Sequence, residues 1–313
     1  MHAPYIKKCI EGVLMQDQTY FQLEYVIADD GSTDGTKEIV SEYARKYPDI
    51  IKLLTSDKNL GVMANAGKAF RAITGKYVAQ CEGDDYWTDP YKLQKQVSFL
   101  EEHLDYSACY HNSMIEYEDG RPSHVRGVKP WDSCTLEELI LNFNDITYPG
   151  YVTAGHTSSM VFRNGLIKAV PPDLAQMMSG DILMQILLAQ HGKAKFINEV
   201  MSTHRIHTGG ISSSHSGFKL YENRIMMYEG LKKFLDQRYE KVLDQVLVMY
   251  YSHVGNLYYY RNKYQEAFYS YRKAFGGFKA MMKMINFRFF VEQYIRPFLV
   301  RVYRLIRKTP NLK

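Results

Sequence analysis

KYVAQCEGDDYW, residues Lys76–Trp87, decides the fold that we expect of this chain. Its apolar run stops abruptly at three closely spaced acids, Glu82, Asp84 and Asp85. Such a run predicts a buried strand that leads into a loop, and in an open α/β sheet ligands collect outside the carboxyl ends of the strands. Clustered carboxylates there suit a hard cation such as Mg²⁺ or Mn²⁺ beside a phosphate. The alternative is a polar turn with solvated acids.

A second acid-ended strand lies upstream. Leu23–Ala28 is a short β-rich run, and it ends in the turn DDGSTDGT at Asp29–Thr36. The glycines permit a tight turn, and its Ser, Thr and Asp residues are good N-cap residues for a helix through about Lys46. A strand, an acidic glycine-rich turn and a helix form the layout of a nucleotide-binding crossover.

Strands and helices continue to alternate on both sides of these two stretches. The first 16 residues form an amphipathic pattern with Ile6, Ile10, Val13 and Leu14 on one helical face. The next expected elements are the strand Ile50–Thr55, the helix Val62–Ile73, the strand Lys76–Cys81 and the helix Tyr91–His103. This alternation predicts an α/β fold with a mostly parallel sheet flanked by helices. Right-handed crossovers would bring the acid-tipped strand ends to one edge, so that Asp30 and Asp85 face one ligand.

The pattern is less regular beyond residue 105. We expect a strand at Tyr106–Tyr117, a helix at Thr135–Asn142 with a Thr135/Glu138 capping box, a binding loop at 144–156, a strand at Ser158–Arg163, a helix from Ser179-Gly180-Asp181 to His191, a strand at Lys195–Met201 and a loop at His204–Ser212. From about Gly217 onward the chain is expected to be helical. Tyr251, Gly255, Tyr258, Ala267, Tyr271 and Ala274 follow tetratricopeptide-like spacings. Because one such unit cannot bury its own apolar face, a helical hairpin packed on its neighbour is the favoured interpretation.

Composition sets broad limits. The chain has 313 residues, of which 46% are hydrophobic, and this is ample for a buried core. The net charge of +5 is too mild to indicate nucleic acid. The four cysteines are scattered without CxxC spacing, which predicts free thiols in a reducing compartment. With no visible signal peptide or membrane-spanning run, we expect a cytoplasmic location.

Five pieces in order resemble glycosyltransferase family 2, whose members have the nucleotide-sugar-binding GT-A fold. They are VIADDGSTDGT at Val26–Thr36, DKNLG at Asp57–Gly61 with Asn65 after it, GKYVAQCEGDDYW at Gly75–Trp87, the Gly180-Asp181 step and HRIHTGGIS at His204–Ser212. The resemblance covers about residues 1–215, so we expect a glycosyltransferase domain there and a helical region at 216–313.

The resemblance implies roles for individual residues on the donor side. Asp30 would contact the base or ribose of the nucleotide, and Asp85 would bind Mg²⁺ or Mn²⁺ directly. Asp84 would lie near the ribose or just behind the direct ligands of the metal. Asn65 would approach the diphosphate. Lys68 could do the same, or it could be an ordinary solvated helix lysine.

Two further roles are implied on the catalytic side. Asp181 resembles the general base, although the residues Ser179-Gly180-Asp181 by themselves favour a helix N-cap. His207 resembles the histidine that completes the metal site. His204 and His207 are three residues apart, but the glycines that follow predict a loop, so a hydrogen-bonded structural role is favoured for His204 over zinc binding.

The sequence departs from the family in two places. The family domain begins with an apolar strand that contacts the nucleotide base, whereas this sequence opens on residues that resemble those just after that strand. We therefore expect a truncated form of a longer active enzyme. Glu82 stands where many members carry Asp, so its direct role is in doubt.

Aromatic and basic residues alternate over Lys279–Lys308. This pattern predicts either a segment that lies on anionic lipid at the inner face of the cytoplasmic membrane or a packed helix with a solvated basic face.

Together these features predict an inverting, metal-dependent glycosyltransferase. It would move a sugar from a nucleoside-diphosphate donor to a saccharide or lipid-linked saccharide acceptor during synthesis of a surface polysaccharide. A non-catalytic scaffold built on a truncated domain is the alternative. A sugar nucleotidyltransferase would need a basic glycine-rich loop near the N-terminus, and none is visible.

Overall fold

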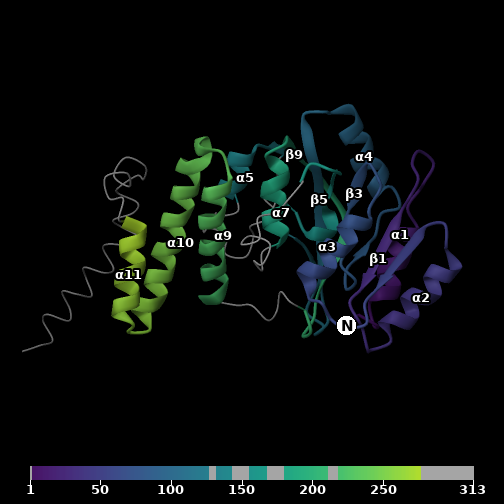
Figure 1. Cartoon of the computed structure of the whole chain (residues 1–313), viewed down its shortest axis with the longest axis horizontal. Helices are drawn as coiled ribbons and strands as arrows, with labels where there is room; N and C mark the ends of the chain where they lie inside the picture. The colour runs from purple at the N-terminus through teal and green to yellow at the C-terminus, as the bar shows by residue number, and fades with distance from the viewer. Residues whose placement is uncertain (1, 127–131, 143–154, 168–179, 211–217, 276–313) are drawn as a thin grey trace, which may run out of the picture. The chain divides into compact units, whose positions relative to one another are not determined.

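The computed structural model describes residues 2–126, 132–142, 155–167, 180–210 and 218–275 (Figure 1). The chain divides into two compact units, residues 1–243 and residues 244–313. The boundary that we expect from the sequence at residue 215 marks the end of the family resemblance and stays a prediction. None of the helices in the described ranges is long and apolar enough to cross a bilayer.

The first unit begins as the sequence predicts, with helices and strands in alternation. In chain order the elements are α1 (Ile6–Leu14), β1 (Tyr25–Asp29), α2 (Thr36–Lys46), β2 (Ile51–Thr55), α3 (Val62–Ala72), β3 (Tyr77–Ala79), β4 (Tyr86–Trp87) and α4 (Lys92–Glu102). The later elements are β5 (Tyr106–Tyr117), β6 (His124–Val125), β7 (Ser133–Cys134), α5 (Leu136–Asn142), η1 (Thr157–Ser159), β8 (Val161–Arg163), α7 (Gly180–Ala189), β9 (Lys193–Ile206) and α9 (Phe218–Phe234).

The strands form two sheets. β1 and β2 pair in parallel, and the larger sheet has the order β3-β8-β5-β9-β4, with β6 on β5 and β7 on β9. The α/β class with helices around the sheet is confirmed, but the sheet is mixed. In the larger sheet β5 and β9 run parallel, and the other strand pairs found among the described residues are antiparallel. Antiparallel strands can pair without a crossover helix between them. The alternation of strands and helices in the sequence therefore does not reveal which strands pair in this way.

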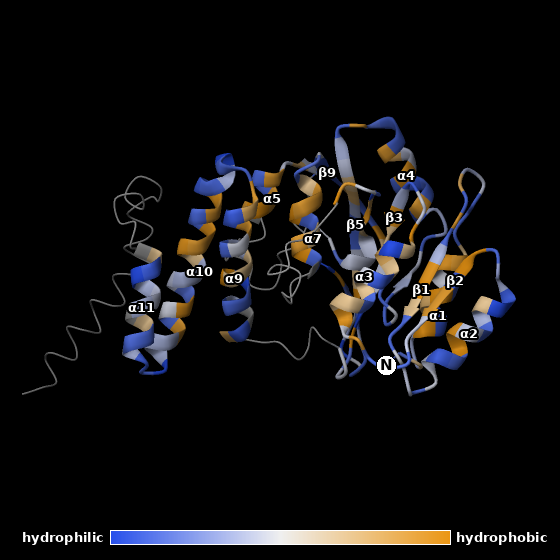
Figure 2. Ribbon diagram, in the orientation of Figure 1, coloured by the Kyte–Doolittle hydropathy of each residue, from blue (hydrophilic) through white to orange (hydrophobic). Residues whose placement is uncertain are grey.

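Helix α1 joins the two sheets through its apolar face. Ile6, Cys9 and Ile10 pack with Ile27 of β1 and Val40 of α2. Val13, one turn further along, belongs to the cluster around Trp87 and Leu93 instead. The amphipathic face read from the sequence is confirmed, and it serves two cores (Figure 2).

Two further predictions from the sequence, the capping box at Thr135 and Glu138 and the free cysteines, are confirmed. The hydroxyl of Thr135 accepts a hydrogen bond from the backbone N–H of Glu138, and the Glu138 carboxylate accepts from the backbone N–H of Thr135 at 2.8 Å, as a capping box requires. All four cysteines are free. The binding loop expected at 144–156 and the basic aromatic stretch at Lys279–Lys308 lie almost entirely outside the described residues.

The second unit contains most of α10 (Glu240–Tyr260), followed by α11 (Tyr264–Phe275). Its two helices form a hairpin in which Asn262 adopts a left-handed conformation at the turn. A Cβ atom on Gly255 would lie 2.7 Å from the ring of Tyr271, and the Tyr271 hydroxyl lies 2.5 Å from Asn256 Oδ1. The glycine and tyrosine of the repeat-like pattern therefore set the close approach of these helices.

Candidate functional site

Strand register places Asp85 against His204. β4 and β9 run antiparallel with Tyr86 opposite Thr203 and Trp87 opposite Ser202. Continuing this register back by one residue brings Asp85 to His204. The sequence predicts a loop at His204, but β9 extends to Ile206 because it continues to pair with β5, with Ile115 opposite His204.

Asp85 is the most buried acid of this edge, with a relative exposure of 0%. Its Oδ1 accepts a hydrogen bond from the backbone N–H of Arg205 at 3.0 Å and lies 3.1 Å from His204 Nδ1. Its Oδ2 lies 3.1 Å from His156 Nδ1. Burial alone would raise the pKa of Asp85, but the contacts with the two imidazoles hold it below its usual range. Asp85 is therefore a carboxylate.

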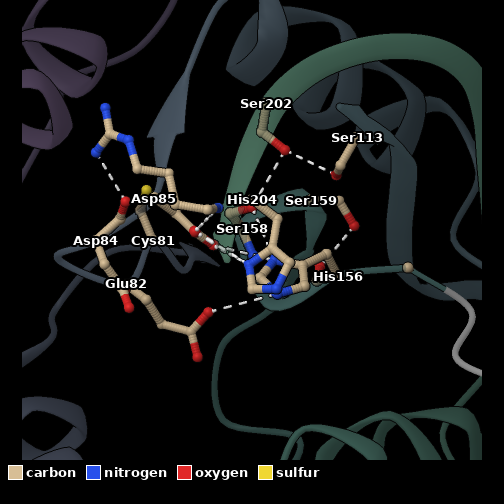
Figure 3. Close-up of polar contacts among 12 residues, drawn as sticks. Cys81, Glu82, Asp84, Asp85, Ser113, His156, Ser158, Ser159, Ser202 and His204 are labelled. Atoms are coloured by element: carbon tan, nitrogen blue, oxygen red, sulfur yellow. Dashed lines mark hydrogen bonds and ion pairs between the residues drawn. The ribbon is translucent and has the colours of Figure 1, made fainter. Parts of the chain in front are cut away.

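His156 reaches Asp85 from a different part of the chain (Figure 3). It caps the short helix η1, and its ring accepts a hydrogen bond from the backbone N–H of Ser158. The His156 and His204 rings lie 3.8 Å apart between centroids. Burial lowers the pKa of His156, although Asp85 opposes this effect.

A buried polar cluster fixes η1 beneath these rings. The indole N–H of Trp87 donates to the Ser158 carbonyl at 2.9 Å. The Ser158 hydroxyl donates to the Ser202 hydroxyl, which lies 2.9 Å from the hydroxyl of Ser113 (Figure 3). Four separate segments thus hold the two histidines in place, and satisfied buried networks of this kind are rigid.

Asp84 forms a second pair with His207. The Oδ2 atom of Asp84 lies 3.1 Å from His207 Nε2, and the His207 ring packs on Tyr5 at a centroid distance of 4.7 Å. The sequence assigns His207 to the metal together with Asp85. In the structure the His207 ring contacts Asp84, and its role at the metal stays a prediction. Asp84 keeps about a fifth of its side chain exposed, so this pair is open to solvent.

Arg205 adds positive charge beside the acids. Its Nη1 donates to the Asp84 carbonyl at 2.8 Å, and its Nε donates to Glu116 Oε2 at 3.2 Å. The guanidinium lies over the rings of Tyr5 and Tyr86, at 5.3 and 4.5 Å from their centroids. Ring faces and an acid therefore fix its position.

Glu82 lies at the open side of the acid cluster and near Asp181. Desolvation, followed by the negative charges of Asp85, Asp84 and Asp181, raises the pKa of Glu82 well above its usual value. Asp181, in the first turn of α7, contributes to this shift through its negative charge. Glu82 Oε2 also lies 3.8 Å from His156 Nε2.

The residues that the sequence assigns to the sugar donor form hydrogen bonds to backbone groups at or near the carboxyl ends of β1 and β2. Asp30 accepts hydrogen bonds from the backbone N–H groups of Leu60 and Gly61, both at 2.9 Å. Asn65 donates to the Ala28 carbonyl at 2.9 Å, while its buried Oδ1 has no hydrogen-bond partner among the described residues. Lys68 donates to the Thr55 carbonyl at 2.5 Å. These contacts order the acidic turn and the loop beside it.

A divalent cation fits this edge. Among the described residues, Asp85, His156 and His204 offer ligand atoms that all lie within 4.8 Å of one another. One carboxylate and two imidazoles suit Mn²⁺ or another transition ion better than Mg²⁺, which prefers an all-oxygen set. The sequence predicts a structural role for His204, and it does not mark His156 or Arg205 as site residues. No local pattern marks His156, because it meets Asp85 only through tertiary contacts.

Several proteins resemble this chain in sequence. Uncharacterized protein Rv1520 of Mycobacterium tuberculosis is 34% identical over 242 residues, which are 77% of this chain and 65% of that protein. A Bacillus subtilis protein provisionally named as the teichuronic acid biosynthesis glycosyltransferase TuaG is 28% identical over 67% of this chain and 77% of its own length. The chain thus spans just under two thirds of the mycobacterial relative.

Solved structures share the fold at low identity. S. aureus TarS in complex with UDP-GlcNAc superposes with a TM-score of 0.61 at 19% identity, covering 88% of this chain and 77% of that one. The mannosyltransferase PcManGT from Pyrobaculum calidifontis, in complex with GDP-Man and Mn²⁺, gives a TM-score of 0.56 at 15% identity, covering 98% and 85%.

The family itself is established by sequence. Residues 2–167, more than half of the chain, match the family described as glycosyl transferase family 2. The matched range includes the acidic turn after β1, the acids after β3 and His156. This chain therefore belongs to glycosyl transferase family 2.

Proposed function

We propose that this protein is an inverting glycosyltransferase that uses a nucleoside-diphosphate sugar and a saccharide or lipid-linked saccharide acceptor. The observation that carries the proposal is the acid cluster of Glu82, Asp84 and Asp85, in which His156 and His204 both contact Asp85. The bound donors named for TarS and PcManGT, together with the biosynthetic name of TuaG, support a role in surface polysaccharide synthesis.

Asp181 is the general base in this proposal. It takes the proton of the acceptor hydroxyl while that oxygen bonds to the anomeric carbon from the face opposite the leaving group. The bond from the anomeric carbon to the diphosphate oxygen breaks at the same time, and the nucleoside diphosphate leaves with both electrons of that bond. The configuration at the anomeric carbon is therefore inverted.

The other acids bind the donor. Asp30 binds the base or ribose of the nucleotide at the end of β1. Asn65 approaches the diphosphate, and Asp84 lies near the ribose. Asp85, His156 and His204 would hold a divalent cation, and His207 contacts Asp84. A bound Mn²⁺ would supply positive charge for the leaving diphosphate. Arg205, fixed over two tyrosine rings, adds permanent positive charge to the same edge.

Calorimetric titration with UDP and GDP, with and without Mn²⁺, tests donor binding, and transfer from UDP-sugars and GDP-sugars tests the activity.

Asp181→Asn should lower transfer by about 100-fold or more while nucleotide binding stays unchanged, because only the base is lost. Asp49→Asn, an exposed acid outside the site, is the matched control. Full transfer activity in Asp181→Asn would refute the mechanism. A chain that binds neither nucleotide would favour the scaffold function instead.

A further inference from the structure

Two of the four free cysteines lie in contact with each other. Cys9 is on the buried face of α1, and its Sγ atom lies 3.7 Å from the Sγ atom of Cys81, which follows β3. The two residues are 72 positions apart in the sequence, so only the tertiary fold brings them together. Because a disulfide bond is about 2.05 Å long, the two sulfur atoms are within about 2 Å of bonding distance.

The chain segments that carry the two thiols are also packed together. A Cβ atom on Gly83 would lie 3.2 Å from Cδ1 of Ile6 in α1. Cys9 Sγ lies 3.4 Å from the carbonyl oxygen of Glu82. Cys81 packs against the apolar cluster to which Cys9 belongs. A small adjustment of α1 and of the loop after β3 therefore suffices to join the two sulfur atoms.

The two thiols differ in exposure. Cys9 is 1% exposed. Cys81 is half-buried, and it lines a cavity of about 950 Å³ that residues of β1 and β3 also line. A small oxidant therefore meets Cys81 first. The contact with Cys9 and burial raise the pKa of the Cys81 thiol well above its usual value, so little thiolate is present and the pair stays reduced unless an oxidant is plentiful.

Cys9 also contacts the turn that carries Asp85. The Glu82 carbonyl oxygen accepts a hydrogen bond from the backbone N–H of Asp85 at 3.0 Å, and the Cys9 thiol donates to the same oxygen. A disulfide has no S–H group to donate. Oxidation would remove this donor, and it would pull Cys81, which lies beside the acids in Figure 3, toward α1. Both changes act on the turn that positions Asp85.

We propose that Cys9 and Cys81 are a redox modification site, and that their oxidation to a disulfide by a hydroperoxide weakens cation binding at Asp85. The effect on the cation rests on the proposed function, whereas formation of the disulfide does not.

The chemistry takes two steps, with hydrogen peroxide as the oxidant. The Cys81 thiolate attacks one peroxide oxygen and the O–O bond breaks, which leaves a sulfenic acid at Cys81 and a hydroxide that takes up the former thiol proton as water. The Cys9 sulfur then attacks the Cys81 sulfur, and the S–O bond breaks. The second oxygen leaves as water with the Cys9 proton. Two thiols are oxidised to one disulfide, and one peroxide is reduced to two waters.

Peptide mass mapping of the full chain tests disulfide formation. Trypsin releases Cys9 in peptide 9–37 and Cys81 in peptide 77–92. After treatment with excess hydrogen peroxide and alkylation of the remaining thiols, the natural protein should yield these peptides joined, and a phosphine reductant should separate them. Cys134→Ser removes a buried thiol outside the pair and should give the same joined peptides. Their absence from the oxidised natural protein would overturn the proposal.

Electron paramagnetic resonance of Mn²⁺ tests the effect on cation binding. Once peroxide is removed, the oxidised protein should bind Mn²⁺ about 10-fold or more weakly than the reduced protein, and the reductant should restore binding. Cys81→Ala cannot form the disulfide, so peroxide should leave its Mn²⁺ binding unchanged. This control also excludes methionine oxidation as the cause, and Cys9→Ser replaces it if Cys81→Ala does not fold.

Two outcomes separate this inference from the proposed function. Joined peptides with unchanged Mn²⁺ binding would overturn the regulatory effect of the disulfide. Failure of the reduced protein to bind Mn²⁺ would refute the proposed cation site and the effect on it, while the joined peptides would still establish the modification site.

Discussion

Lys92 is fully buried, although its side chain carries an amine. Its Nζ donates to Gln96 Oε1 at 2.9 Å and lies 4.2 Å from the centroid of the Trp87 ring. Burial lowers the pKa of Lys92 from 10.5 to about 7. The folded protein therefore binds this proton less tightly than the unfolded chain does.

Lys92 should therefore make stability depend on pH. Between about pH 7 and 10.5 the unfolded chain binds more protons at this site than the folded chain, so the free energy of unfolding rises with pH. The full effect is on the order of 5 kcal/mol. Urea unfolding at pH 7 and pH 9 should show a larger gain for the natural protein than for Lys92→Met. Lys58→Met, at an exposed lysine, is the control. An equal pH dependence in all three proteins would contradict the prediction.

The histidine pair on Asp85 gives a prediction at the same scale. His156→Ala and His204→Ala each remove one donor from the set that includes Asp85, so each should weaken Mn²⁺ binding by about 10-fold or more. Electron paramagnetic resonance of Mn²⁺ measures this without substrate. His124→Ala removes an exposed histidine on β6 and should leave binding unchanged. If only His207→Ala weakens Mn²⁺ binding, the ion is held by the pair of Asp84 and His207 instead.

At the scale of elements, α1 lies directly against β4, the strand that follows the acids. A Cβ atom on Gly12 would lie 2.8 Å from the Trp87 carbonyl oxygen and 2.9 Å from its nitrogen. Both are backbone atoms, which cannot turn aside. The missing side chain at Gly12 thus sets how closely α1 packs on β4.

Gly12→Ala should consequently destabilise the protein despite the better helix propensity of alanine. We expect a loss of about 1–3 kcal/mol from overpacking against β4. Gly67→Ala in α3 is the matched control, since its Cβ would meet only the flexible end of Arg71 at 3.4 Å. That change should be neutral or stabilising by about 0.5–1 kcal/mol. Urea unfolding of both variants measures the difference, and similar values would contradict the close-contact argument.

At the scale of the whole molecule, the basic residues concentrate toward the C-terminus. Lys279–Lys308 contains eight Lys and Arg residues among aromatic and aliphatic ones. Each basic residue at an anionic surface contributes about 1 kcal/mol, and salt screens the attraction.

The full chain should accordingly sediment with anionic phospholipid vesicles at low salt and release from them as salt is raised. A chain ending at Phe275 keeps α11 but lacks this stretch, and it should bind at least about 10-fold more weakly. Vesicles of neutral lipid are the control for both chains. Equal binding of the two chains would show that the C-terminal stretch is not a lipid contact.

The amino-acid sequence by itself determined the α/β class, the acid-ended strands and the amphipathic first helix. These follow from local patterns, namely apolar periodicity, glycine-rich turns and capping residues. It also determined the family, because the motifs stand in order along the chain.

Tertiary structure alone decided which side chains meet. The antiparallel register of β4 on β9 brings His204 to Asp85, and the Trp87 contact with Ser158 brings His156 there. It also decided the mixed strand pairing and the cavity that residues of β1 and β3 line. The physical reason is that each of these depends on contacts between segments far apart along the chain, and such contacts leave no periodic trace in the sequence.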